Sequence, residues 1–134
     1  MVYVTVGFDL GVPASPTGVG RALEPRATII LHSGTALAWQ SMAVVDTGAT
    51  FCQLPTQAAN LIGLSLAPAV NCTVMTAGGT VVLQQMLVDL TIHGRRVQVL
   101  ANFGPGSPAL IGRDAMFAAM QTAGFRARDW LINW

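Results

Sequence analysis

The sequence contains no lysine, few charged residues and only two cysteines. All seven basic residues are arginine, charged residues make up 10% of the 134 residues, and the formal net charge is +1. No basic stripe is present, which argues against a nucleic-acid partner. Cys52 and Cys72 are too few and too far apart for a disulfide framework or a zinc ribbon, so we interpret both as buried thiols.

Long hydrophobic runs are also lacking. The apolar stretches at 27–31 and 42–45 are far shorter than the ~20 residues that a membrane-spanning helix needs. The first residues, MVYVTVGFDLGVP, lack the basic start and the long apolar core of a signal peptide. We therefore expect a cytoplasmic protein with no membrane partner for this chain, the alternative being that the chain is a fragment of a larger or membrane-attached protein.

Hydrophobic residues, by contrast, make up 52% of the chain. This composition is typical of a folded protein, and the length fits a single domain over residues 1–134. So apolar a sequence also indicates that part of the surface is buried against another chain.

Short segments rich in β-branched and apolar residues, separated by glycine and proline, predict a mostly β fold. We expect helices only over 57–64, ending at Gly63, and over 114–122, ending near Gly124. Residues 11–20 are expected to form a loop, and Gly78 and Gly79 to supply positive φ at a hairpin tip. The expected strands are 2–6, 27–32, 36–45, 70–75, 81–86, 88–93, 97–101 and 130–134.

The two halves of the chain repeat one order of elements. Each half has a hairpin with a histidine at its turn, then a strand that ends in small residues, then a short helix. The strands end in Asp46-Thr47-Gly48 and in Leu110-Ile111-Gly112. This order is typical of a duplicated β unit.

Asp46 directly follows the apolar residues Ala43-Val44-Val45, at the end of a predicted inner strand. A carboxylate in such a place must accept backbone hydrogen bonds or share its proton with a second acid. Gly48 allows a close approach of the backbone, and Thr47 offers a hydroxyl. Asp-Thr-Gly is also an ordinary turn sequence, so the motif alone leaves both interpretations open.

Three motifs together make the interpretation specific. Val44-Val45-Asp46-Thr47-Gly48-Ala49, the glycine-tipped segment 75–84 and Leu110-Ile111-Gly112-Arg113-Asp114 follow one another in order. In this order and spacing the chain resembles the retroviral-type, or retropepsin-like, aspartic protease family from about Ala27 to Trp134. The resemblance implies a small closed β-barrel-like protomer with hairpins, a flap and one or two short helices, preceded by an N-terminal strand and loop extension over 1–26.

The resemblance also implies a function. Asp46 would be the catalytic acid, supported by Thr47, Gly48 and Ala49, and the second signature would be Leu110, Ile111, Gly112 and Arg113. The flap that contacts substrate would comprise Met75, Thr76, Ala77, Gly78 and Gly79. The partners would be a peptide or protein substrate, with an apolar cleavage bias, and a second copy of the chain, since family members are homodimers that contribute one Asp each and interleave terminal strands such as 130–134.

Peptide hydrolysis by carboxylates needs two acids, one ionised and one protonated. The sequence has one Asp-Thr-Gly, and its other acids lie in predicted positions that do not suit this role: Asp9, Glu24, Asp89, Asp114 and Asp129. A single chain would therefore hold half a site.

The sequence departs from the viral pattern after the catalytic motif. Viral members often carry an Asp there that pairs with the Arg of the second signature, whereas Thr50 and Phe51 occupy this place. Arg113 would then pair with Asp114, Asp129 or Asp9, or with backbone carbonyls.

Other candidate motifs favour structural roles. His32 and His93 lack nearby metal ligands or triad partners and fit hairpin turns. Gly78-Gly79 is not followed by the Lys-Ser/Thr of a phosphate loop, and residues 104–108 lack the order of a nucleophile elbow. We expect no metal and no cofactor. The alternative to an aspartic endopeptidase is a catalytically silent protease-like module for dimerisation or peptide binding.

Overall fold

Strands with alternating burial make up most of the molecule, in agreement with the predicted mostly β class. The computed structural model describes the backbone of residues 4–6, 8–13, 21–119, 122–126 and 129–133, and the side chains of residues 26–119. Two helices are described, α1 (Thr56–Leu61) and α2 (Arg113–Ala119). The strands are β1 (Val4–Val6), β2 (Phe8–Pro13), β3 (Arg21–His32), β4 (Ala38–Val45), β5 (Cys52–Pro55), β6 (Val70–Thr76), β7 (Gly79–Ile92), β8 (Arg95–Gly104), β9 (Leu110–Ile111), β10 (Thr122–Arg126) and β11 (Asp129–Asn133).

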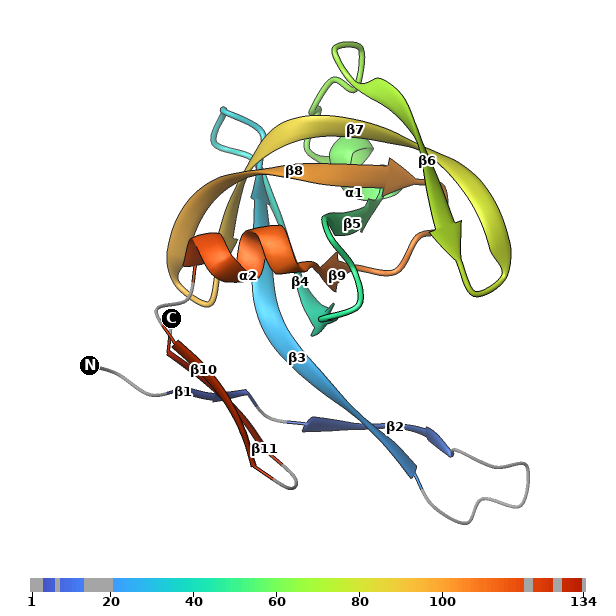
Figure 1. The fold of residues 1–134 in the computed structure, drawn as a ribbon. Helices are drawn as coiled ribbons and strands as arrows, with labels where there is room; N and C mark the ends of the chain where they lie inside the picture. Colours follow the sequence, from blue (N-terminus) through green and yellow to red (C-terminus); the bar gives the residue numbers. More distant parts are fainter. Residues whose placement is uncertain (1–3, 7, 14–20, 120–121, 127–128, 134) are drawn as a thin grey trace.

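The main sheet closes on itself to form a small barrel. Its strands lie in the order β2-β3-β4-β9-β5-β8-β7-β6, and an additional pairing of β3 with β7 closes the ring (Figure 1). Strand β4 runs parallel to β9, and β5 runs parallel to β8. The ends of β4 and β9, which carry the two predicted signatures, therefore lie side by side.

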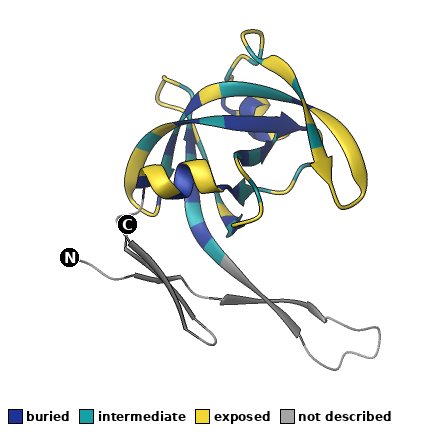
Figure 2. Ribbon diagram, in the orientation of Figure 1, coloured by how far each residue is buried: buried dark blue, intermediate teal, exposed yellow. Residues whose placement is uncertain are grey.

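Apolar residues on alternating positions fill the barrel. In β3 the side chains of Ala27, Ile29 and Leu31 are buried, and β7 buries every second residue from Val88 to Ile92. Helices α1 and α2 add Ala59 and other small or apolar residues to the same core (Figure 2). Each fully buried leucine or isoleucine contributes about 1.5–3 kcal/mol, so this shared core fixes the strand ends that carry the site.

The terminal strands form a separate sheet in the order β1-β11-β10, with antiparallel pairing throughout (Figure 1). The predicted C-terminal strand 130–134 is found as β11, although Trp134 lies outside the described residues. The predicted first strand 2–6 is described from Val4 to Val6.

Three predicted boundaries are wrong because strand pairing extends beyond the local sequence signals. Residues 11–13, predicted as loop, belong to β2, and β3 begins at Arg21 because its first half pairs with β2. Pro13 is tolerated because it ends an edge strand with an irregular register. The segments 81–86 and 88–93, predicted as two strands, are joined in the single strand β7, which ends at Ile92 and pairs with β8 over residues 84–92.

The second predicted helix is also too long. It ends at Ala119 rather than Thr122, and both Thr122 and the predicted stop Gly124 belong to β10, which pairs with β11. The first helix, predicted to Leu64, ends at Leu61, with Gly63 at φ 70° just beyond it. In the first helix the apolar pattern continues to Leu64, past the point where the helix ends.

Candidate active site

The loop after β4 holds the Asp46 carboxylate in place. Val45 is buried at the end of the strand, and Asp46 is half-buried directly after it. The backbone N–H of Gly48 donates to Asp46 Oδ1 at 2.8 Å, and the N–H of Ala49 donates to the Asp46 carbonyl at 3.2 Å. A Cβ at Gly48 would lie 3.1 Å from Asp46 Oδ1, so glycine leaves room for this hydrogen bond. We call residues 46–50 the Asp46 loop.

The second signature anchors this loop through the backbone. The Asp46 N–H donates to the Ile111 carbonyl at 3.0 Å, and the Arg113 N–H donates to the Ala49 carbonyl at 2.9 Å. These bonds continue the parallel pairing of β4 with β9 beyond the strand ends. The two motifs, more than 60 residues apart in the sequence, therefore form one hydrogen-bonded unit.

Gly112 is buried where the two motifs cross. A Cβ built on it would lie 2.5 Å from the carbonyl carbon of Phe51 and 2.8 Å from its nitrogen. Those atoms belong to the backbone and cannot rotate away. The glycine of the second signature is therefore required by the close approach of the segment that follows Asp46.

Arg113 bonds the Asp46 loop with its side chain as well. Its Nη1 donates to the Thr47 carbonyl at 2.8 Å and its Nη2 donates to Thr50 Oγ1 at 3.1 Å. Among the partners left open by the sequence, a backbone carbonyl is therefore the one found. Thr50 supplies a neutral acceptor at the place where viral members often carry an Asp.

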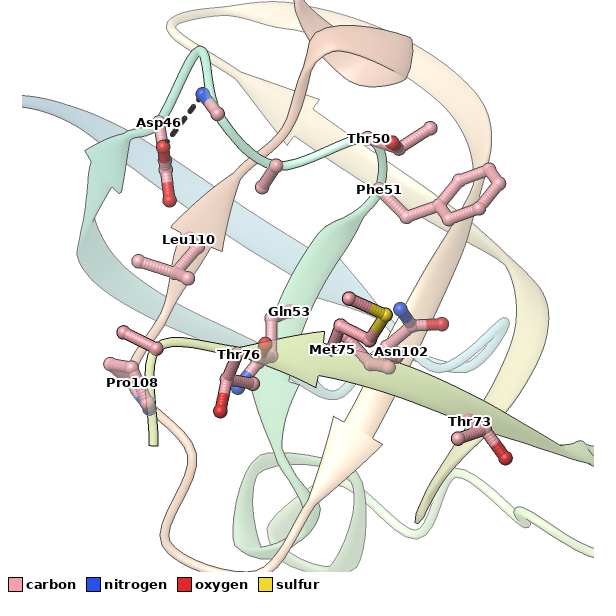
Figure 3. Close-up of a pocket in the computed structure, with 14 residues that line it drawn as sticks. Asp46, Thr50, Phe51, Gln53, Thr73, Met75, Thr76, Asn102, Pro108 and Leu110 are labelled. Atoms are coloured by element: carbon pink, nitrogen blue, oxygen red, sulfur yellow. Dashed lines mark hydrogen bonds between the residues drawn. The ribbon is translucent and has the colours of Figure 1, made fainter. Parts of the chain in front are cut away.

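A pocket of about 700 Å³ opens beside Asp46 and is bounded on one side by the β6–β7 hairpin (Figure 3). Of the predicted site residues, Asp46, Gly48, Ala49, Leu110, Met75, Thr76 and Ala77 line this pocket. The remaining predicted residues do not line the pocket: Thr47 lies within the Asp46 loop, Ile111, Gly112 and Arg113 lie beside that loop, and Gly78 and Gly79 lie at the hairpin tip.

The hairpin tip is exposed and closed by its own bonds. Thr76 pairs with Gly79 across a turn of Ala77 and Gly78, and Thr76 Oγ1 donates to the Gly79 carbonyl at 2.8 Å. Gly79 has φ 118°, as predicted for the tip, whereas Gly78 is not among the glycines with positive φ. Met75 is 87% exposed, which leaves an apolar side chain at the pocket mouth.

Sequence reasoning missed seven residues that line the pocket: Thr50, Phe51, Gln53, Thr73, Val74, Pro108 and Asn102. Two of them carried a usable signal. Gln53 alternates with the buried residues Cys52 and Leu54 in β5, and Asn102 is a buried polar residue among the apolar residues of β8. The others depend on how distant segments meet, which no local pattern reports.

Charge in the pocket comes from one group. Asp46 is the only acidic or basic residue among the described residues that line it. Burial raises the pKa of the Cys52 thiol to about 11, which keeps it protonated and agrees with its interpretation as a buried thiol. Cys72 is partly buried.

Within residues 26–119 the histidines occupy hairpin ends, as predicted. His32 Nε2 is 2.8 Å from Thr91 Oγ1, and His93 adopts φ 46° next to Gly94. No group of three or more His, Cys, Asp or Glu residues that could hold a metal ion occurs in the part of the chain that the structure describes. In the same part, no helix is long and apolar enough to cross a membrane.

Comparison with known proteins gives one family match. No curated protein sequence matches the chain. A family model described as aspartyl protease matches residues 38–115, which include the Asp46 loop, the β6–β7 hairpin and the second signature. Since this match covers more than half of the 134 residues, the chain belongs to the aspartyl protease family.

Proposed function

We propose that the protein is an aspartic endopeptidase that acts as a homodimer, with Asp46 of each chain supplying one of two catalytic carboxylates. The observation that supports it best is a single acid, Asp46, in an open pocket that is otherwise uncharged among the described residues. Peptide hydrolysis by carboxylates needs a pair of acids. A second copy related by a two-fold axis would provide the missing one.

The chemistry follows from a pair that shares one proton, because two adjacent carboxylates cannot both ionise cheaply. The ionised carboxylate removes a proton from water, whose oxygen attacks the carbonyl carbon of the peptide bond. The protonated carboxyl donates to the carbonyl oxygen. The tetrahedral intermediate then collapses, the C–N bond breaks, and the amine nitrogen takes up a proton from the pair.

In this proposal the β6–β7 hairpin is a flap. Its exposed tip borders the pocket, and its bonds at the tip are made within the hairpin. Opening would admit a peptide, and closing would exclude water from the carboxylates. Because one carboxylate must be ionised and the other protonated, the rate should fall on both the acid and the alkaline side of an optimum.

Peptide cleavage by the Asp46→Asn variant tests the assignment. We expect cleavage of a peptide library by the wild-type protein and a loss of about a thousandfold or more in the variant. Asp89→Asn is the matched control, because Asp89 lies outside the pocket and undergoes the same chemical change. Cleavage retained by folded Asp46→Asn, or no cleavage by the wild type under any condition, would contradict the proposal.

Mixing experiments test the homodimer. Wild-type protein equilibrated with a ninefold excess of Asp46→Asn, at saturating substrate, should lose roughly tenfold in activity as mixed dimers replace wild-type dimers. The same excess of an inert unrelated protein should have no effect. If activity is unchanged in the mixture while sedimentation shows a monomer, each chain works alone and the paired site is wrong.

A further inference from the structure

Three carboxamide side chains stand in one row across the sheet at the pocket. Gln53 of β5 pairs with Asn102 of β8, and Asn102 pairs in turn with Gln85 of β7. Directly paired residues of neighbouring strands lie on the same face of a sheet. On its other side Gln53 pairs with Leu110 of β9. The row therefore begins beside the second signature and ends in β7, at the base of the β6–β7 hairpin.

Asn102 is held firmly in this row. It is only 5% exposed, and its Oδ1 accepts from Gln85 Nε2 at 2.9 Å and from Cys72 Sγ at 3.5 Å. Since both donors use the oxygen, the orientation of the carboxamide is fixed from β7 and from β6. Its nitrogen makes no hydrogen bond among the described residues. Asn102 lines the pocket and thus offers it an oriented donor.

Gln53 presents the complementary group. It is half-buried and lines the pocket, and its carboxamide has no hydrogen-bond partner in the part of the chain that the structure describes. Figure 3 shows Leu110 between Asp46 and Gln53, with Met75 and Thr76 of the hairpin beside the amides. One wall of the pocket is thus polar and uncharged, next to the reacting carboxylate but separate from it.

We propose that Gln53 and Asn102 form a carboxamide subsite that selects a glutamine or asparagine side chain of the peptide substrate. The inference rests on the proposed function, because it names the substrate side chain that the same pocket would bind. The substrate carbonyl accepts from the Asn102 nitrogen, and the substrate amide N–H donates to Gln53 Oε1. Both groups of the substrate carboxamide are then satisfied when the hairpin covers the pocket.

Other side chains fit this wall less well. An aliphatic side chain would cover Gln53 and Asn102 without pairing their polar atoms, which costs the desolvation of those atoms. A carboxylate would be brought near the charge of Asp46, and a cation would find no further acid among the described lining residues. A site that hydrogen-bonds its ligand strongly rejects an analogue that lacks the polar group. An apolar pocket discriminates less strongly between ligands that differ only in shape.

The test uses matched peptides. A cleavage profile of a peptide library first identifies the position where glutamine or asparagine is enriched, and peptides with glutamine, methionine or glutamate at that position are then compared. Methionine and glutamate are nearly isosteric with glutamine but apolar and charged, respectively. We expect kcat/KM to be about tenfold or more higher for the glutamine peptide than for either analogue.

The variant Gln53→Met tests whether Gln53 causes the preference for glutamine. It should lower kcat/KM for the glutamine peptide and raise it for the methionine peptide, so that their ratio falls by about tenfold. Gln98→Met is the matched control, because Gln98 is exposed on the same strand as Asn102 and lies outside the pocket; its ratio should stay unchanged. An apolar or absent preference in the wild type, or an unchanged ratio in folded Gln53→Met, would overturn the subsite.

Binding separates this inference from the proposed function. The inactive Asp46→Asn protein should bind the glutamine peptide more tightly than the methionine and glutamate peptides, as measured by fluorescence anisotropy with labelled peptides drawn from affinity selection. If no peptide is cleaved but this order of binding is found and depends on Gln53, the endopeptidase proposal fails while the subsite stands. Cleavage that depends on Asp46 but lacks the order of preference would overturn the subsite and leave the endopeptidase standing.

Discussion

The Asp46 loop and the tip of the β6–β7 hairpin are both short, glycine-containing turns at the same pocket, yet they are supported in different ways. The loop is bonded by the second signature through backbone and side chain, at Asp46, Ala49, Thr47 and Thr50. The hairpin tip is bonded within itself, and residues 75–82 are exposed (Figure 2).

This contrast matches what each region must do in the proposed enzyme. A carboxylate that activates water has to stay within a few tenths of an ångström of its working position, so the surroundings must hold it. A segment that admits a peptide has to move, and moving segments have few buried contacts. In the proposed enzyme the same residue types would serve rigidity in one place and mobility in the other, according to what packs against them.

Gly112→Ala should disrupt the support of the Asp46 loop and have the largest effect on stability. The new Cβ would overlap the backbone of Phe51, which cannot relax by rotating a side chain. We expect a loss of about 3 kcal/mol or more in the free energy of unfolding, measured by denaturant titration. Gly104→Ala is the control: the atoms nearest to its Cβ would belong to the side chains of Leu83 and Ser107, which can move, so its loss should be clearly smaller. Equal losses would show that the crossing at Gly112 is not a special constraint.

Gly79→Ala tests whether the tip of the β6–β7 hairpin has to move, and Gly94→Ala is the control for it. Both glycines have positive φ, 118° and 83°, in exposed hairpin turns with open space around the Cβ position. Each substitution should therefore cost stability, about 1–3 kcal/mol, with the larger cost at Gly79 because its φ lies further from the left-handed region that alanine can adopt. Only Gly79 belongs to the hairpin that borders the pocket, so only Gly79→Ala should lower kcat, by several-fold. Equal kinetics for the two variants would argue against a flap.

Arg113→Ala should loosen the Asp46 loop without removing a side chain that lines the pocket. The change removes two hydrogen bonds to Thr47 and Thr50, and since the guanidinium is exposed we expect a loss of about 1 kcal/mol. It should lower kcat more than it raises KM, because the loop carries the carboxylate and Arg113 does not line the pocket. Arg95→Ala, at an exposed hairpin end, is the control and should change neither kcat nor KM.

The sequence was sufficient to predict the mostly β fold, the hairpin and the position of the Asp46 loop. These features depend on local signals: β-branched runs, paired glycines, and an acid placed directly after buried residues. The contact between the two signatures is a finding of the structure, through the bonds between Asp46 and Ile111 and between Ala49 and Arg113. Their catalytic roles stay predictions until activity is measured.

Features that depend on distant partners could not be predicted. Strand β7 continues through Leu87 because its residues 84–92 pair with β8, and no residue in the segment itself indicates this. The end of α2 was misplaced because 122–126 pairs with β11. The amide row of Gln53, Asn102 and Gln85 joins three strands from separate parts of the chain, so it becomes visible only once the register is known.

The smallest expected effect concerns the ion pair of Asp89 and Arg96, which belongs to neither the Asp46 loop nor the hairpin tip. It joins β7 to β8 outside the pocket. Arg96 donates from Nε to both Asp89 oxygens, at 3.0 and 2.9 Å, and its Nη2 also bonds Asp89 Oδ2. The hydrogen bond from Arg96 holds the pKa of Asp89 below its usual value of 3.8 in the folded protein. Asp89 therefore contributes stability above its unfolded pKa, and this contribution is lost as the pH falls through the lower folded value.

Because both side chains are in contact with solvent, the contribution should be small and should weaken with salt. Asp89→Asn and Arg96→Gln, with the double variant, form a cycle that isolates the pair from the other effects of each change. We expect a weakly favourable coupling energy at pH 7 and low salt that shrinks toward zero in high salt and as acid protonates Asp89, with kcat/KM unaffected throughout. A coupling that is independent of pH would mean that the carboxylate charge is not its source, and a change in kcat/KM would mean that this edge of the barrel communicates with the pocket.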